Sequence, residues 1–291
     1  MRIAVASGKG GTGKTTIATS LALALDPDST LLLDCDVEAP NSHLYLKPEI
    51  IDRHTVGVRI PVVAESKCTH CGRCMEVCEF HAITVIGQNT LVFPELCHGC
   101  GSCTLVCPEG AISEQLSVTG SLERGATPAG LAFGRGVLDV GQPMAVPIIR
   151  QLKNEFNLQT PNGDTVIVDA PPGTSCPVVE SIRGADFVLL VTEPTPFGLH
   201  DLKLAVAVVH ELNLPAGVII NRDGIGNAAV ESFCQQAGIP ILLRIPMQRE
   251  IAVALAQGTP LVSAFPEYRA RFQQLYAQIT ALVAGTREAA R

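Results

Sequence analysis

The sequence predicts an α/β protein with a parallel β-sheet, interrupted by one small cysteine-rich module. Apolar runs of strand length alternate with amphipathic stretches of helix length, which is typical of a parallel sheet covered by helices on both faces. A glycine-rich loop separates the first apolar run from the first helical stretch. Eight of the 11 cysteines lie between residues 68 and 107, which marks this segment as a unit of its own.

The elements of the main domain follow from hydrophobic periodicity. Strands are expected near residues 2–6, 30–34, 165–169, 187–192, 216–220 and 241–245. Helices are expected near residues 14–25, 143–155, 199–211, 226–237 and 248–257. A chain of 291 residues with 47% hydrophobic residues and a mean hydropathy of +0.29 can bury a large core. The cysteine-rich module is expected at residues 61–116, so that the main domain comprises residues 1–60 and 117–291.

The last part of the chain shows apolar residues at helical spacing. This pattern predicts a helix that packs on the sheet, because the segment lacks the lysines typical of a membrane-surface helix. The residues of the pattern are Phe272, Leu275, Tyr276, Ile279, Leu282 and Val283.

The glycine-rich loop has the composition of a phosphate-binding loop, or P-loop. Its glycines allow backbone N–H groups to surround phosphates, and the following helix directs its positive end at the anion. Lys14 is expected to reach the β- and γ-phosphates, and the Thr15 hydroxyl to bind Mg²⁺. The expected nucleotide-binding residues are Gly8, Lys9, Gly10, Gly11, Thr12, Gly13, Lys14, Thr15 and Thr16.

Two further apolar strands end in acidic residues. Residues 31–33 lead into Asp34 and Asp36, and residues 165–168 lead into Asp169, which begins the segment that ends at Gly173. Carboxylates at strand ends beside a P-loop hold Mg²⁺ and position the attacking water. Together with the P-loop, these acids predict ATP hydrolysis.

The cysteine-rich segment contains the same motif twice. Each copy has the spacing C-x-x-C-x-x-C-x-x-x-C, which is similar to that of bacterial two-cluster ferredoxins. In that arrangement the fourth cysteine of each copy binds the cluster of the other copy. The expected ligands are Cys68, Cys71, Cys74 and Cys107 for one 4Fe-4S cluster, and Cys97, Cys100, Cys103 and Cys78 for the second.

A zinc site is the main alternative to the clusters. Tetrahedral zinc takes four ligands and gives no reason for two copies of one spacing, so zinc is disfavoured. A disulfide framework is also disfavoured, because nothing in the first residues resembles a secretory signal, and a cytoplasmic location is expected. The first motif has Glu79 where the second has Pro108, so the sequence does not predict the geometry of the loop after Cys78.

These motifs together resemble the deviant Walker ATPases, which include MinD, Mrp and the nitrogenase iron protein. The resemblance rests on Lys9 within the P-loop, on the segment from Asp34 to Asn41, and on Asp169 to Gly173, and it covers essentially the whole chain. It implies a P-loop NTPase fold with an inserted ferredoxin-like α+β domain. It also implies a nucleotide-dependent homodimer.

The same resemblance implies roles for four residues. Lys9 would cross a dimer interface to the partner's nucleotide, and Asp36 would be the catalytic carboxylate of the first switch loop. Asp169 would be the Walker B acid, and Asn221 would contact adenine. Lys14 completes the expected catalytic set.

Several other residues carry open interpretations. Cys234 is expected in the core, whereas Cys35 and Cys176 are candidates for a further cluster, with Cys176 pairing across a dimer as in the nitrogenase iron protein. His70 and His98 either tune the clusters through hydrogen bonds or are exposed loop residues. The glycine-rich segment from 125 to 141 is interpreted as either a mobile loop or a plain connector.

The amino-acid composition disfavours nucleic acids and membranes as partners. The formal charge of −7 and the absence of tryptophan argue against a nucleic-acid surface. Stable membrane insertion is not expected. The sequence therefore predicts an iron–sulfur ATPase that couples nucleotide state to electron transfer to an unidentified partner protein. The alternatives are an ATPase for cluster assembly or delivery, disfavoured because no C-x-x-C follows residue 107, and a spatial-positioning ATPase, which needs no clusters.

Overall fold

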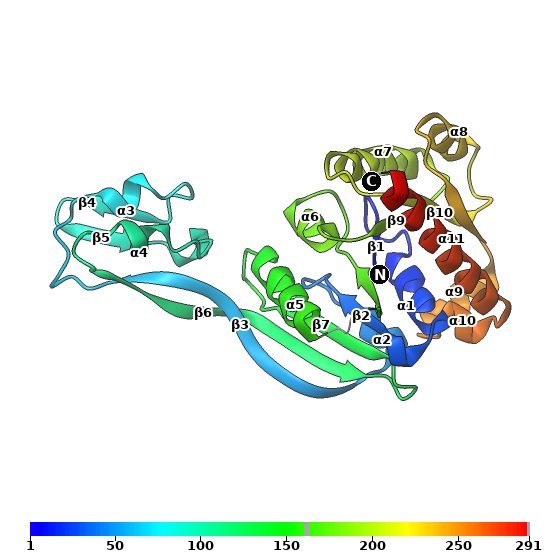
Figure 1. The fold of residues 1–291 in the computed structure, drawn as a ribbon, viewed down its shortest axis with the longest axis horizontal. Helices are drawn as coiled ribbons and strands as arrows, with labels where there is room; N and C mark the ends of the chain where they lie inside the picture. The colour runs from blue at the N-terminus through cyan, green and yellow to red at the C-terminus, as the bar shows by residue number, and fades with distance from the viewer. Residues whose placement is uncertain (160–162, 290–291) are drawn as a thin grey trace.

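The computed structural model describes residues 1–159 and 163–289 and contains one nine-stranded sheet with helices on both faces (Figure 1). Seven strands run parallel, and the last two are added antiparallel at one edge. In spatial order the strands are β11 (Ile241–Pro246), β10 (Ala216–Asp223), β9 (Phe187–Thr192), β1 (Arg2–Ala6), β8 (Thr165–Asp169), β2 (Thr30–Asp34), β7 (Ala132–Leu138), β6 (Ile112–Ala126) and β3 (Glu49–Val63). The expected parallel α/β sheet is confirmed, with six of its strands at the expected positions.

Helices cover both faces because both faces of the central strands are apolar. On β1, Ile3 and Val5 point into one core while Ala4 and Ala6 point into the other, and all four side chains are buried. One core is covered by α5 (Val146–Gln159), α6 (Cys176–Ile182), α7 (Pro196–Glu211) and α8 (Ala229–Gln236). The other is covered by α1 (Lys14–Ala24), α2 (Ser42–Leu46), α9 (Arg249–Ala256), α10 (Leu261–Ala264) and α11 (Glu267–Ala289), and a short 3₁₀ helix η1 (Pro27–Ser29) follows α1.

Helix α11 packs on the sheet, as its periodicity predicts. Phe272, Leu275, Ile279 and Val283 are buried in the second core, whereas Leu282 remains 38% exposed. None of the helices in the described part of the chain combines the length and the apolar character that a membrane crossing needs.

Strands β3 and β6 form a long two-stranded ribbon that leaves the sheet and carries a small lobe (Figure 1). Each strand has 15 residues. Pro61 and residues 116–121, at the expected boundaries of the cysteine-rich module, lie inside these strands. The ribbon pairs Val63 with Ile112 at its outer end, so that the two chain segments entering the lobe lie side by side.

The glycine-rich segment from 125 to 141 contains the end of β6, a tight turn and strand β7, so the expectation of a mobile loop or connector is wrong. Gly134 and Gly136 of β7 allow close packing of helix α5. A Cβ at Gly134 would lie 2.4 Å from Cζ of Phe156, and one at Gly136 would lie 2.7 Å from Cγ2 of Ile148. Helix α5 therefore approaches β7 more closely than larger residues would allow.

The lobe contains short elements arranged around its cysteines. These are α3 (Arg73–Glu76), β4 (Ile83–Ile86), β5 (Asn89–Val92), the 3₁₀ helix η2 (Pro94–Leu96) and α4 (Ser102–Val106). Its apolar core is small: Ile83 and Ile112 pack with Cys74 in one cluster, and Val58 and Ile60 pack with Cys97 in another. Cysteine side chains thus form a large part of the interior of this lobe.

Candidate nucleotide site and cysteine sites

The P-loop connects β1 to α1 in a conformation that its glycines permit. Gly11 and Gly13 have positive φ angles of 78° and 93°, and a Cβ at Gly8 would lie 2.1 Å from the carbonyl oxygen of Asp201. Gly13 caps the N-terminus of α1 without a side-chain hydrogen bond, which leaves the first N–H groups of the helix available. The loop is therefore preformed for an anion.

A cleft of about 490 Å³ lies over this loop, a size that suits a nucleotide. The residues that line it include the expected site residues Gly10, Gly11, Gly13, Lys14, Thr15, Thr16, Asp36 and Asn221. It is also lined by residues that the sequence did not single out, among them Pro246, Met247, Gln248, Ile251 and Leu255. Gly8, Lys9, Thr12, Asp169 and Gly173 do not line the cleft directly.

Asp34 and Asp169 lie opposite each other in adjacent parallel strands, and both are fully buried. Asp34 organises the first switch loop, because its Oδ2 accepts hydrogen bonds from the backbone N–H groups of Asn41 (3.0 Å) and Ser42 (2.9 Å). The Ser42 hydroxyl then donates to Asp169 Oδ2 at 3.0 Å. Asp34 was expected only as one of a pair of strand-end acids, and Ser42 was missed.

Burial shifts the acids of this site toward their neutral forms. Burial, followed by the charge of Asp34, raises the pKa of Asp169 to about 7, against the opposing effects of Thr15, Lys14 and Ser42. Burial raises the pKa of Asp34 as well. Asp36 is half-buried, and burial together with the charge of Asp34 raises its pKa to about 6. A bound cation would favour the ionised forms of Asp34, Asp36 and Asp169.

Lys9 is held within its own chain. Its Nζ lies 3.5 Å from Oε2 of Glu193, whose side chain is only 7% exposed. The other oxygen of Glu193 accepts a hydrogen bond from Nη1 of Arg222 at 2.5 Å. Glu193 follows β9 directly and was not identified from the sequence, because no motif connects it with the P-loop.

The amide of Asn221 contacts the P-loop. Its Nδ2 donates to the carbonyl oxygen of Thr12 at 2.8 Å, and its Oδ1 accepts from the N–H group of Arg222 at 3.0 Å. A Cβ at Gly13 would lie 2.4 Å from this Nδ2. Asn221 therefore lines the cleft and supports the P-loop from β10.

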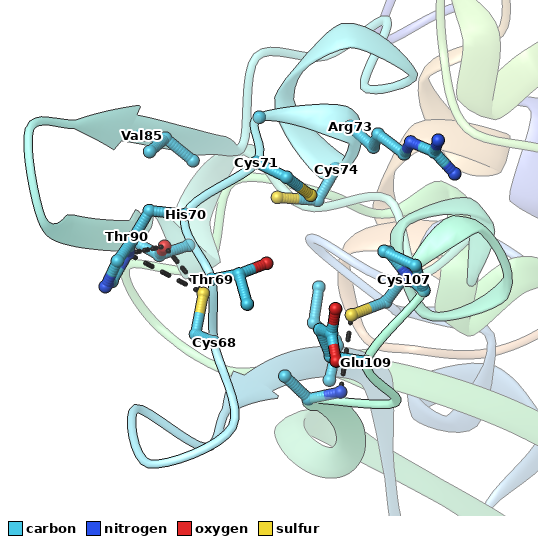
Figure 2. Close-up of a pocket in the computed structure, with 14 residues that line it drawn as sticks. Cys68, Thr69, His70, Cys71, Arg73, Cys74, Val85, Thr90, Cys107 and Glu109 are labelled. Carbon is cyan, nitrogen blue, oxygen red and sulfur yellow. Dashed lines mark hydrogen bonds between the residues drawn. The ribbon is translucent and has the colours of Figure 1, made fainter.

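The first cysteine cavity brings together the four residues expected for one cluster (Figure 2). Cys68, Cys71 and Cys74 come from the loop before and the start of α3, and Cys107 follows α4. Cys68 Sγ lies 3.4 Å from the Thr90 hydroxyl and 3.6 Å from His70 Nδ1. The side chains of His70 and Thr90 also lie 3.2 Å apart, so both groups face one sulfur.

The second cavity contains the other expected set: Cys78, Cys97, Cys100 and Cys103. It lies closer to the body, because Arg59 and Pro61 of the ribbon line it. His98 stacks on Phe80 beside it, with ring centroids 3.7 Å apart. Hydrogen bonding to Ser102 lowers the pKa of Cys100, whereas burial raises the pKa of Cys97 and Cys103.

The loops after the two motifs have matching geometry despite Glu79 and Pro108. In the first, the N–H group of Ala82 donates to Cys78 Sγ at 3.3 Å, and in the second, that of Ala111 donates to Cys107 Sγ at 3.3 Å. His81 and Gly110 occupy equivalent left-handed positions, with φ angles of 51° and 55°. The difference at Glu79 therefore leaves this loop unchanged.

The cysteine sulfurs are spaced more widely than a single metal ion requires. Four Zn–S bonds of about 2.3 Å hold the sulfurs about 3.8 Å apart. Among residues 1–159 and 163–289, the one group of three or more potential ligands within 4.8 Å is Asp52, His54 and Glu155, which contains no cysteine. The cavities thus suit a larger group than zinc.

The remaining cysteines lie apart from these cavities. Cys35 is fully buried, and burial raises the pKa of its thiol to about 12, which makes it a poor ligand. Cys234 belongs to α8 and is buried in the core, as expected. Cys176 is exposed at the first position of α6.

Comparisons with known proteins identify relatives of this chain and structures with a similar fold. An uncharacterized protein of Methanocaldococcus jannaschii is 32% identical over 79% of this chain and 83% of its own length. An iron-sulfur cluster carrier protein of Aquifex aeolicus is 27% identical over 91% of this chain and 62% of its own length. The structure of the cell division ATPase MinD of Pyrococcus furiosus matches with a TM-score of 0.58 and 21% identity, over 97% of this chain and 98% of that chain.

A MinD structure from Pyrococcus horikoshii, determined with Mg-ADP, has a TM-score of 0.57 and 20% identity over 96% of this chain and 95% of that chain. At these identities, both structural matches establish the fold. Residues 3–261 match the model of the CobQ/CobB/MinD/ParA nucleotide binding domain. This match spans most of the chain and includes the P-loop, both acidic strand ends and Asn221, and the chain therefore belongs to this family of nucleotide-binding proteins.

Proposed function

We propose that this protein is an ATPase that binds two 4Fe-4S clusters and couples its nucleotide state to electron transfer to a partner protein. The observation that carries this proposal is the composition of the two cavities in the lobe. Each contains three cysteines of one motif and the last cysteine of the other, next to a body of the nucleotide-binding family. Such exchange of fourth ligands is typical of two-cluster ferredoxins.

The residues over the P-loop fit an ATP complex with Mg²⁺. Oδ1 of the buried Asp169 has no hydrogen-bond partner among the residues that the structure describes, so a ligand there would satisfy it. Thr15, which lines the cleft, and Asp169 would hold the Mg²⁺, which neutralises phosphate charge. Lys14 binds the phosphates, and Asp36 orients the attacking water and accepts its proton.

The lobe fits clusters better than zinc because its cysteine sulfurs are spaced more widely than four Zn–S bonds would hold them. Bound clusters would supply one-electron transfer. The chain itself supplies the N–H groups of Ala82 and Ala111, which donate to Cys78 and Cys107 and stabilise thiolate charge. Cys71 and Cys100 are exposed, so each cavity has one ligand near the surface where a partner would dock.

The proposal includes a homodimer that forms when ATP is bound. Lys9 would leave Glu193 and reach the nucleotide of a second copy of this chain, so that ATP links two protomers. Because Lys9 is 32% exposed, it can exchange partners without unfolding the P-loop.

Cluster assembly or delivery is the second candidate, since several relatives are named iron-sulfur cluster carrier proteins. This chain has no C-x-x-C after residue 107, and shared ligation would make release of a cluster disrupt the surrounding lobe. A spatial-positioning role would leave the eight cysteines of the lobe without a purpose.

The test is a comparison of redox behaviour with cluster retention. The reconstituted protein is titrated in Mg-ADP and in Mg²⁺ with a nonhydrolysable ATP analogue, and is separately incubated with ATP and an apo-ferredoxin acceptor. We expect cluster potentials that differ between nucleotide states and clusters retained through many turnovers. A 60 mV shift of a one-electron couple corresponds to about 1.4 kcal/mol, which lies within the usual range of allosteric coupling. Identical potentials with rapid transfer of iron to the acceptor would support delivery instead.

A further inference from the structure

We infer that helix α5 couples the nucleotide site to the cysteine-bearing lobe. Arg150 and Lys153 are positioning residues for α6, and Gln151 and Glu155 are positioning residues for the base of the ribbon. This inference rests on the proposed function and names the residues through which nucleotide state would reach the lobe. Figure 1 shows α5 between α6 and the ribbon formed by β3 and β6.

The path begins at the nucleotide cleft. Pro172 lines this cleft and belongs to the loop that follows Asp169. The N–H group of Gly173 donates to the carbonyl oxygen of Ser7 at 3.0 Å, which ties this loop to the start of the P-loop. Helix α6 begins at Cys176, directly after the loop. A change in the loop on γ-phosphate binding would therefore displace α6.

Helix α5 holds the C-terminal end of α6 through two cations. Lys153 Nζ donates to the carbonyl oxygens of Glu180 (2.5 Å), Ser181 (3.0 Å) and Arg183 (2.7 Å). A positive charge is favourable there, because the C-terminal carbonyls of a helix carry partial negative charge. Arg150 forms a two-bonded pair with the Glu180 carboxylate, at 3.3 and 3.1 Å. These bonds would make α5 follow a displacement of α6.

The neighbouring residues of α5 hold the ribbon. Gln151 Nε2 donates to the carbonyl oxygen of Gly57 at 2.8 Å, and Glu155 Oε2 lies 3.0 Å from His54 Nε2. Ile148 packs so closely on the ribbon that a Cβ at Gly120 would lie 2.5 Å from its Cδ1. Helix α5 thus contacts both strands of the ribbon.

The contact at Gly57 coincides with a bulge. Val56 pairs with Gly120 whereas Gly57 pairs with Val118, so Thr119 is an extra residue in β6. A bulge bends a strand and interrupts its pairing, which makes it a natural hinge. The six residues that follow Gly57, up to Val63, then extend the ribbon by about 20 Å toward the lobe. A rotation of about 10° at the bulge would move the outer end of the ribbon, and the lobe with it, by about 3–4 Å.

The experiment measures hydrogen exchange in the full-length, cluster-loaded protein, in Mg-ADP and in Mg²⁺ with a nonhydrolysable ATP analogue. One double variant, Gln151→Ala with Glu155→Ala, breaks the contact between α5 and the ribbon. Asn154→Ala, on the exposed side of α5, is the matched control. We expect nucleotide-dependent exchange at residues 56–63 and 112–120 in the wild type and the control. In the double variant the difference in ribbon exchange between the two nucleotide states should fall at least fivefold. The corresponding difference in α6, and the rate of ATP hydrolysis, should stay within twofold of the wild type.

A second double variant, Arg150→Ala with Lys153→Met, breaks the contact with α6, and Lys153→Arg is its conservative counterpart. Ribbon exchange should again lose its nucleotide dependence, and Lys153→Arg should retain it. Iron content and circular dichroism verify that the variants are folded.

The redox titrations separate the two proposals. If the potentials of the wild type depend on nucleotide and both double variants keep this dependence, the coupling through α5 is overturned and the proposed function stands. If the potentials of the wild type are the same in both nucleotide states, the proposed function itself fails.

Discussion

The ammonium group of Lys9 lies 3.5 Å from the buried carboxylate of Glu193 in its own chain. This pair places the P-loop lysine on the side of the loop that faces β9 and not in the nucleotide cleft. Arg222 binds the other oxygen of the same carboxylate. Glu193 therefore binds two cations at the edge of the nucleotide site. If Lys9 leaves, the Glu193 carboxylate remains paired with Arg222.

A change at Glu193 should alter nucleotide-dependent dimerisation. In Glu193→Gln, Lys9 loses its partner in the same chain, and because the pair is partly exposed we expect a two- to fivefold lower ATP concentration for half-maximal dimer formation. Lys9→Ala should abolish the ATP-dependent dimer with the fold intact. Light scattering measures both, and an ATP-dependent dimer of Lys9→Ala would remove the proposed role of this lysine.

Binding and hydrolysis of ATP should be separable. Lys14→Ala removes the cation that faces the phosphates, so nucleotide binding should be lost. Asp36→Ala leaves the P-loop intact, so binding should persist while turnover falls at least 100-fold, as expected for loss of the group that positions water. Isothermal titration calorimetry and phosphate release measure these outcomes. Unchanged hydrolysis in both variants would contradict the assignment.

The exchange of fourth ligands can be tested with cysteine pairs. The wild type, purified without oxygen, should contain about eight irons and eight sulfides per chain. Cys68→Ser with Cys107→Ser damages one cavity, so about four irons should remain. Cys68→Ser with Cys78→Ser damages both cavities, and iron should fall well below four. Cys234→Ala serves as the control. If the variant with Cys78→Ser kept about four irons and the variant with Cys107→Ser kept fewer, each motif would bind its own cluster. Stoichiometric zinc without sulfide in the wild type would exclude clusters.

Stability without nucleotide should depend on pH through Asp36. Its pKa is 3.8 as a reference value and about 6 in the folded chain, so the folded state binds a proton more tightly than the unfolded state. The stabilisation is fully present below the reference value and is lost as pH rises through about 6. Asp36→Asn should therefore flatten the decrease in unfolding free energy between about pH 4 and 6. Equal slopes for the two proteins in urea denaturation would contradict the shift.

Two glycine substitutions should have opposite effects on stability. In Gly134→Ala the new methyl group would lie 2.4 Å from the ring of Phe156, which should cost about 1–3 kcal/mol. Gly285 lies in α11, and no described atom outside its own helix backbone lies within 4 Å of a Cβ added there. Gly285→Ala should therefore stabilise the helix by about 0.5–1 kcal/mol. Urea denaturation of both variants measures the difference, and destabilisation by Gly285→Ala would contradict the helical assignment.

The sequence alone predicted the parallel sheet, because strands such as 165–169 are continuous apolar runs and parallel strands are buried on both faces. It also identified the P-loop and its neighbouring acids, because their chemistry depends on residues close together in the chain. The lobe was visible through cysteine spacing, which is likewise local.

Tertiary structure decided what depends on residues far apart in the chain. The ribbon of β3 and β6 was missed because its pairing joins residues far apart in the chain, such as Asp52 and Arg124, and because residues 49–55 of β3 are exposed and show no apolar alternation. The glycines of β7 suggested a loop, because the close approach that they permit depends on the distant residues Phe156 and Ile148. Glu193 and Lys153 lie in no motif, and their roles arise from Lys9 and from the end of α6, which the fold alone brings to them. Local chemistry can be read from neighbouring residues, whereas contacts between distant segments exist only once the chain has folded.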